Sequence, residues 1–350
     1  MSAKITLGSV SAPHWQRGVN LIEIMVAMTI GLFLVLGATT LYVNTKKTSD
    51  VDDAIARLQE TARYAMSAIE TDVRMSNYWG QFKDSSKVDG KASQLLPAGS
   101  ANALAVGTGA DDCGAAYIDP EAYISATNNN YNLDCPANSA EVASADTLTV
   151  RRANTAAVPL STTRFQLCTT RNSGKVTLGA DPECPTTNVE YHNLVVNGYY
   201  VDQQSDQNPN YPALRRWTLI DGPTFSDVEI IPGVEDMQIE LGWDNTDDRT
   251  QRPKAVRYVQ PENAVLTNAA GFPNMRIVSV RVWLLIRAEQ ADNTFTDDRT
   301  YVYGDRLVAN GTVNDLSDAA APGAAYAPGD NFRRVLVSRT FFIRNVTGNY

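Results

Sequence analysis

A single acidic residue, Glu23, stands near the start of a long apolar segment, five residues after Gly18. The segment reads "RGVNLIEIMVAMTIGLFLVLGATT" over residues 17–40. An ionised carboxylate inside hydrocarbon costs about 2.5–3.5 kcal/mol on insertion scales. A plain membrane anchor has no use for such a residue, so we expect Glu23 to have a function beyond anchoring.

Four cysteines lie downstream of the apolar segment and are candidates for disulfides: Cys113, Cys135, Cys168 and Cys184. An even number of cysteines beyond a membrane segment is typical of an oxidising compartment. Pairing of neighbours, Cys113 with Cys135 and Cys168 with Cys184, closes loops of about 15–25 residues, and each bridge stabilises by about 3 kcal/mol. We favour this pairing, while the two other connectivities remain open on sequence alone.

Other residues that carry catalytic or metal chemistry are sparse. Only one histidine, His192, lies outside the first 18 residues, and no CxxC pair occurs. Zinc sites usually need four Cys or His ligands, and many hydrolases need a histidine beside the nucleophile. The acidic stretches "DNTDDR" (244–249) and "DNTFTDDR" (292–299) do not match an EF-hand loop, so we predict solvated turns there. We therefore expect no enzyme, no metal site and no cofactor.

The 350-residue chain is acidic, with 30 basic residues against 39 acidic ones and a net charge of −9. Nucleic acid is not expected as the main partner, because proteins that bind it usually carry a basic face. Arginine doublets at 151–152, 215–216 and 333–334 could form local basic patches. We predict instead that they are solvated ends of strands.

The apolar segment has the length of a membrane-spanning helix. Residues 24–45 contain no charge and span about 33 Å as a helix, close to a bilayer core of about 30 Å. Lys4 and Arg17 precede the segment, which favours a cytoplasmic N-terminus and a single pass. No convincing small-residue cleavage site of a secretory signal peptide follows it.

The helical pattern continues beyond this segment. Apolar residues that step by three or four positions form one stripe: Val51, Ile55, Leu58, Ala62, Ala65, Ile69 and Val73. Asp72 and other charged residues fill much of the remaining surface. We predict one helix from about Asn20 to Met75, with an apolar half over 19–45 and an amphipathic half over 46–77.

The segment "RGVNLIEIMVAMTIGLFLVLG" resembles the class III signal of type IV pilins and pseudopilins. In that family a prepilin peptidase cuts after a glycine and methylates the new N-terminal residue, and a glutamate is fifth in the mature chain. The resemblance implies a leader over 1–18, cleavage between Gly18 and Val19, N-methylation of Val19, and pairing of Glu23 with the N-terminal amine of a neighbouring subunit. Two features depart from the family pattern, because the first mature residue is Val rather than Phe or Met and the leader is longer than many.

Residues 78–350 are predicted to form a β-rich globular domain. Residues 81–146 read as long loops with short strands, and residues 309–331 as a long loop. Strands are predicted over 146–153, 237–243, 277–287 and 333–345, largely antiparallel because apolar and polar residues alternate. The Asn-Gly pair in "LVVNGYYV" (194–201) predicts a hairpin turn. The expected fold is α+β and type IV pilin-like, with a long N-terminal helix packed on a largely antiparallel sheet.

Five segments resemble PilW-type minor pilins of type IV pili: "ARYAMSAIETDVRMSNYWG", "SADTLTVRRA", "GVEDMQIELGWD", "VSVRVWLLIRA" and "RRVLVSRTFFIRN". The resemblance implies a structural subunit that primes pilus assembly and forms the tip complex, supporting twitching motility and adhesion. Implied partners are other minor pilins, the major pilin, the prepilin peptidase and a PilY-type tip adhesin. The implied location is the bacterial inner membrane, with the globular domain in the periplasm, and then the pilus.

Two other interpretations remain. J-type pseudopilins of type II secretion share the signal and the general architecture, but are usually smaller than the mature chain of 350 − 18 = 332 residues. A membrane-anchored periplasmic enzyme or binding protein belongs to a different class, and predicts an intact leader.

Overall fold

The computed structural model describes residues 18, 20–82, 88–89, 118–120, 122–131, 133, 135–221, 224–245, 254–263, 265–266, 276–306 and 326–346. The chain divides into two compact units, Met1–Asp53 and Ala54–Tyr350. The elements in order are α1 (Leu21–Met75), β1 (Val88–Asp89), β2 (Ile124–Thr127), β3 (Thr147–Ala153), β4 (Phe165–Thr169), β5 (Gly174–Leu178), β6 (Glu190–Asp202), β7 (Ala213–Leu219), β8 (Phe225–Pro232), β9 (Val234–Asp244), β10 (Arg257–Val259), β11 (Arg276–Arg287) and β12 (Arg334–Phe342).

The predicted N-terminal helix is confirmed, since α1 is one helix of 55 residues. No proline interrupts this stretch, and about half of its residues are good helix formers. Past its C-terminal end the chain turns through Gly80, whose φ is +71°. A Cβ at Gly80 would lie 2.7 Å from the ring of His192, so both the backbone angle and the close approach require glycine.

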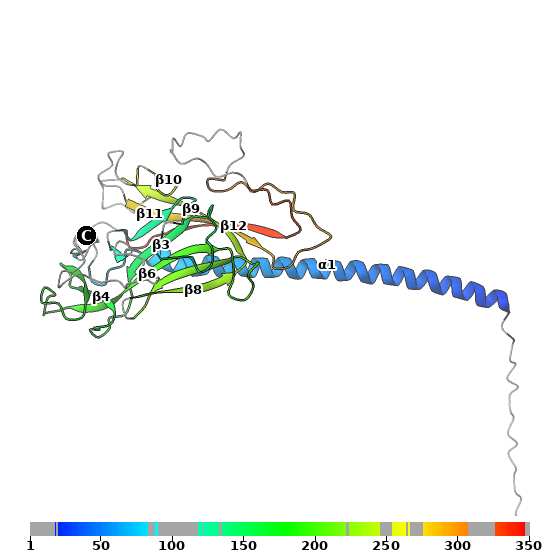
Figure 1. Ribbon diagram of the computed structural model, residues 1–350, viewed down its shortest axis with the longest axis horizontal. Helices are drawn as coiled ribbons and strands as arrows, with labels where there is room; N and C mark the ends of the chain where they lie inside the picture. The colour runs from blue at the N-terminus through cyan, green and yellow to red at the C-terminus, as the bar shows by residue number, and fades with distance from the viewer. Residues whose placement is uncertain are drawn as a thin grey trace, which may run out of the picture. The chain divides into compact units, whose positions relative to one another are not determined.

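Within the second unit, the C-terminal part of α1 packs on the strands shown beside it in Figure 1. Its buried apolar residues follow the predicted stripe from Leu58 onward: Leu58, Ala62, Ala65, Met66, Ile69 and Val73. They share one hydrophobic core with residues of both sheets, among them Tyr199, Met237 and Val282. Burial of this apolar face stabilises the helix against the strands.

The strands form two sheets. The eight-stranded sheet has the order β1-β5-β4-β6-β3-β2, with β7 paired to β6 and β8 paired to β7. The four-stranded sheet has the order β10-β9-β11-β12. Among the described pairs of named strands, β1 with β5 is parallel and the others are antiparallel. The predicted α+β fold with a largely antiparallel sheet is therefore confirmed.

The alternation of side chains is clearest in β11. The alternate residues Val278, Val280, Val282, Leu284 and Ile286 are all buried in the core that α1 shares. Strands β3, β9 and β12 also lie where the sequence predicts them. In β11 the period of two therefore places the apolar face correctly.

The predicted hairpin turn at Asn197-Gly198 is wrong, because β6 runs straight through it. The Asn197 side chain is buried and donates a 2.6 Å hydrogen bond to Asp72 on α1, while its carbonyl oxygen accepts one of 2.6 Å from Thr218 on β7. Strands β3 and β7 pair with both sides of this segment of β6. These tertiary contacts outweigh the local preference of the Asn-Gly pair for a turn.

Candidate assembly site

Glu23 lies in the first turn of α1 and is exposed. The carbonyl of Asn20 accepts hydrogen bonds from the backbone N–H groups of Glu23 (3.0 Å) and Ile24 (3.2 Å) and so begins the helix. A carboxylate near this end interacts favourably with the helix dipole. Gly18 precedes the helix and is exposed, and Val19 lies outside the described residues.

The apolar part of α1 is long and apolar enough to cross a membrane, by length and composition alone. Its large side chains are exposed, with fractions from 43% at Val43 to 76% at Leu21. An apolar surface of this extent marks a membrane or protein contact in a natural chain. The first unit therefore presents an apolar helix with one acid near its N-terminal end.

At the other end of α1, Asp72 is buried, although the sequence pattern placed it on the polar surface. Its carboxylate accepts hydrogen bonds from Arg152 Nη2 (2.9 Å), Asn197 Nδ2 (2.6 Å) and Tyr199 Oη (2.7 Å). Burying a carboxylate is costly unless it is paired and hydrogen-bonded, and here it is both. Asp72 thus fixes α1 to strands β3 and β6, a role that helical periodicity does not reveal.

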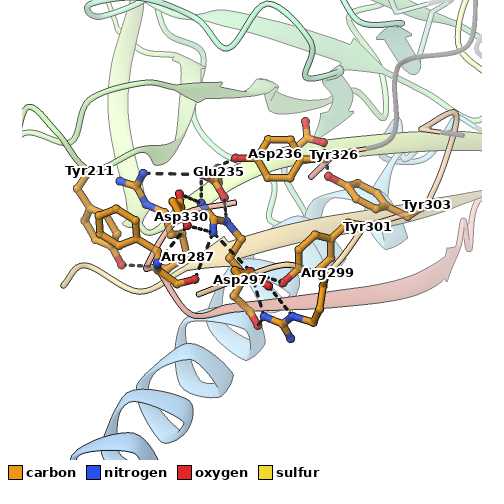
Figure 2. Close-up of polar contacts among 12 residues, drawn as sticks. Tyr211, Glu235, Asp236, Arg287, Asp297, Arg299, Tyr301, Tyr303, Tyr326 and Asp330 are labelled. Carbon is orange, nitrogen blue, oxygen red and sulfur yellow. Dashed lines mark hydrogen bonds and ion pairs between the residues drawn. The ribbon is translucent and has the colours of Figure 1, made fainter. Parts of the chain in front are cut away.

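Arg334, at the start of β12, forms the centre of a second buried network that the sequence reasoning missed. Its fully buried side chain donates to Glu235 (2.5 and 3.0 Å) and Asp330 (2.6 and 2.7 Å), and Asp297 lies 3.5 Å away. Figure 2 shows Glu235, Asp297 and Asp330 converging from separate parts of the chain. The network ties β9, β12 and the segment that carries Asp297 into one unit.

Two carboxylates of this network, Asp330 and Asp297, are held in their charged forms. The Arg334 guanidinium lowers the pKa of Asp330. Burial alone would raise the pKa of Asp297, but hydrogen bonds from Arg299 and Tyr301 outweigh burial and hold it below its usual range. Asp330 and Asp297 are therefore ionised at neutral pH.

Asp236 follows Glu235 on β9 and is the centre of a further set of buried hydrogen bonds. Tyr303 Oη donates to it at 2.5 Å and Arg306 Nε at 2.6 Å. Burial raises the pKa of Tyr303, and the neighbouring Asp236 carboxylate raises it further, so the phenol stays protonated as a donor. Three of the tyrosines in Figure 2, Tyr301, Tyr303 and Tyr326, thus donate hydrogen bonds to the carboxylates of Asp297, Asp236 and Glu235.

The arginine doublets are not solvated strand ends, so that prediction is wrong. One arginine of each doublet is buried, with exposed fractions of 3% at Arg151, 3% at Arg215 and 4% at Arg334. Arg215, for example, contacts Asp206 at 2.6 Å and Asp227 at 2.7 Å. Buried arginines persist where carboxylates satisfy them, and the sequence gives no local signal for such distant partners.

The acidic stretch at 292–299 contains an exposed turn, as predicted, but two of its acids, Asp292 and Asp297, form ion pairs. Asp292 pairs with Arg333 at 2.8 Å, and its hydrogen bonds from Thr294 and then Arg333 lower its pKa to about 2. Asp297 is fully buried. In the stretch at 244–249, Asp244 pairs with Arg276 at 3.0 Å, while residues 246–249 lie outside the described part. Within the described ranges, no group of three or more His, Cys, Asp or Glu residues could hold a metal ion.

The cysteine prediction is confirmed for one bridge, Cys168–Cys184. Cys135 is buried and disulfide-bonded, whereas Cys113 lies outside the described residues, so the second pairing stays a prediction. His192 is a buried strand residue, as expected, with Nδ1 3.0 Å from the carbonyl of Asn154.

Comparisons with known proteins agree with the motifs. Residues 198–345 match the family model described as Type IV Pilus-assembly protein W, PilW. A solved type IV-like pilin from Thermus thermophilus is similar at 11% sequence identity and a TM-score of 0.33, over 83% of this chain and 100% of that chain. No curated protein matches the chain significantly. The match to the PilW model covers less than half of the chain, and it shows that residues 198–345 are similar to the PilW family of pilus-assembly proteins.

Proposed function

We propose that this chain is a minor pilin that is made as a membrane-anchored prepilin, cleaved between Gly18 and Val19 and methylated at Val19. The observation that carries the proposal is the PilW match at residues 198–345, on the same chain as an apolar N-terminal helix with an acid in its first turn. Gly18 is exposed and precedes α1, which supports access by a peptidase.

The proposed role of Glu23 is to select the position of a neighbouring subunit. Cleavage would create a cationic amine at Val19, four residues before Glu23. Both charges are poorly solvated at a membrane, where an unpaired carboxylate costs about 2.5–3.5 kcal/mol. The cost is relieved when the amine of a second subunit meets Glu23, so pairing fixes the register of the two helices.

The mature chain would then join other minor pilins and the major pilin. We assign it to a complex in the inner membrane that primes assembly and later forms the pilus tip, with a PilY-type adhesin as a further partner. In this role the chain would support twitching motility and adhesion as a structural subunit. The globular domain would lie in the periplasm before assembly.

The test is the variant Glu23→Ala, with Glu60→Ala as a matched control because Glu60 is an exposed acid on the same helix. We expect Glu23→Ala to be cleaved but to fall on the order of tenfold in sheared pili, and Glu60→Ala to remain within twofold of the wild type. Normal incorporation of the Glu23 variant would refute the register role.

A further inference from the structure

The second unit contains a polar pocket of about 370 Å³ that borders both of its sheets. Its wall includes residues of the connection between β6 and β7, residues near the start of β9 and the last residue of β11. Figure 2 shows four residues of this wall, Glu235, Asp236, Arg287 and Tyr326. The volume lies near the lower end of the range of about 300–1,000 Å³ that is typical of small-molecule pockets, so the pocket suits a small ligand.

Two arginines of the wall are held in fixed positions. Arg306 Nε donates to Asp236 at 2.6 Å, and its Nη2 donates to the carbonyl of Ser144 at 2.8 Å. Arg287 Nη2 donates to the carbonyl of Asn210 at 2.7 Å. The shape of the wall is thus formed before a ligand binds, which lowers the entropy cost of binding.

The charged groups of the wall balance each other. Asp236 pairs with Arg306 at 2.6 Å. Glu235 Oε1 lies 3.7 Å from Arg287 Nη1 and accepts a hydrogen bond of 3.0 Å from Tyr326 Oη. The charges of the four ionic residues of the wall therefore sum to 2 − 2 = 0. An ion that entered the pocket would bring a charge without compensation, so the wall favours a neutral ligand.

The wall also carries polar groups that the fold does not use. The carboxamides of Gln204 and Asn210 make no hydrogen bond to another residue in the described part of the chain. Each carboxamide offers an acceptor oxygen and two N–H donors, which match sugar hydroxyls because a hydroxyl both donates and accepts. Tyr326 adds an aromatic ring, and the partial negative charge on the face of such a ring attracts the C–H groups of a sugar.

We propose that this pocket binds one neutral sugar unit of a glycan. The hydroxyls of the sugar pair with the carboxamides of Gln204 and Asn210, and its lack of charge suits the balanced ion pairs of the wall. A peptide fits less well, because it would need apolar pockets for its side chains and the apolar wall residues are limited to Val142, Pro209 and Pro212. This inference goes beyond the proposed pilin role, since sugar binding depends on the second unit and not on cleavage or on incorporation into a pilus.

The test is a titration followed by saturation-transfer NMR, with the full-length chain in a detergent that has no sugar headgroup. The neutral probes are the methyl glycosides of β-D-galactose, β-D-glucose and N-acetyl-β-D-glucosamine. Each has about 13–16 non-hydrogen atoms, so at ordinary ligand efficiency we expect a Kd on the order of 1 mM for at least one of them. Two contrast probes, the anionic methyl glycoside of N-acetylneuraminic acid and the neutral peptide N-acetyl-diglycine amide, should bind at least about tenfold more weakly.

Two double variants locate the binding. Gln204→Ala with Asn210→Ala removes both carboxamides and should weaken binding of the glycoside at least about tenfold, because its hydrogen bonds to the wall are lost. The matched control is Gln207→Ala with Asn172→Ala, which removes the same two types of side chain from exposed positions outside the wall. The control should leave the Kd within about twofold of the wild type.

Three results would overturn the proposal. The first is that no neutral glycoside binds at concentrations up to about 10 mM. The second is that the anionic sugar or the peptide binds as tightly as the neutral glycosides, and the third is an equal loss of binding in the two double variants. Absence of N-terminal cleavage with sugar binding intact would instead count against the proposed function alone.

Discussion

Replacing Arg334 by methionine is expected to destabilise the second unit more than any other single arginine change on β12. Methionine keeps an apolar stem but removes a fully buried guanidinium that contacts Glu235, Asp330 and Asp297. Breaking a buried ion pair from one side costs about 3–5 kcal/mol, because the partner charges stay buried without compensation.

The structure places the expected loss near the lower end of this range, at about 3 kcal/mol. Asp297 is fully buried but keeps Arg299 at 2.7 Å and Tyr301 at 2.8 Å. Asp330 is 36% exposed and can regain water, and Glu235 keeps the hydroxyl of Tyr326 at 3.0 Å. For a unit of this size, about 3 kcal/mol corresponds to a Tm about 5–10 °C lower.

The assay is thermal unfolding of the full-length chain in detergent at pH 7, followed by circular dichroism. Arg339→Met is the matched control, because Arg339 lies on the same strand, is 54% exposed and forms an exposed ion pair with Glu70. An exposed pair contributes about 0–1 kcal/mol, so the control should lose no more than about 2 °C. Equal shifts in the two variants would refute the claim that burial makes Arg334 special.

Three further predictions concern the rest of the unit. Asp292→Asn should lower the Tm at pH 7, and the difference from the wild type should shrink steadily as the pH falls from about 4 to about 2; a difference at pH 2 as large as that at pH 7 would contradict this. A hydrogen bond from Thr294 is the main cause that lowers the pKa of Asp292 in the folded chain to about 2. A carboxyl group with a lowered pKa stabilises the folded state at pH values above its pKa in the unfolded chain. This stabilisation is lost as the pH falls through its pKa in the folded chain. Asp72→Ala should cost about 3 kcal/mol in chemical denaturation, because three buried donors lose their acceptor, and a loss below 1 kcal/mol would contradict the buried network. Intact-mass analysis after alkylation should find no reactive thiol before reduction and four after it, and peptide mapping should join Cys168 to Cys184; free thiols in the unreduced chain would show the pairing to be incomplete.

Local sequence signals predicted the elements that depend on local physics. The step of three or four residues predicted α1, and the period of two predicted β9, β11 and β12 together with the buried faces of their residues. In both cases the pattern depends on which side of an element meets the core, and neighbouring residues are enough to reveal it.

The errors fall where a distant partner decides the structure. Asn197-Gly198 is a strong turn signal, but buried contacts to α1 and β7 keep it in a strand. Arg334 meets Glu235 from 99 residues away, and Asp72 meets Asn197 from 125 residues away. No periodicity in one sequence shows which charges will converge in the core, so buried ion networks are read as surface charge.

The residues around the candidate assembly site also divide into those that the local sequence predicts and those that depend on distant partners. The apolar run, the acid and the preceding glycine are visible in the sequence, and the structure places Glu23 in the first turn of an exposed helix. The ion pair between Glu70 and Arg339 was not predicted, because it joins the end of α1 to β12 across 269 residues (339 − 70).

The central claim, that this chain is a processed pilin, is tested most directly by the mass of its mature N-terminus. The full-length gene product is expressed with a prepilin peptidase, and the purified chain is analysed by mass spectrometry. The account predicts a chain that begins at Val19 and carries one added methyl group on its α-amine. A chain that still begins at Met1 in the presence of an active peptidase would contradict it.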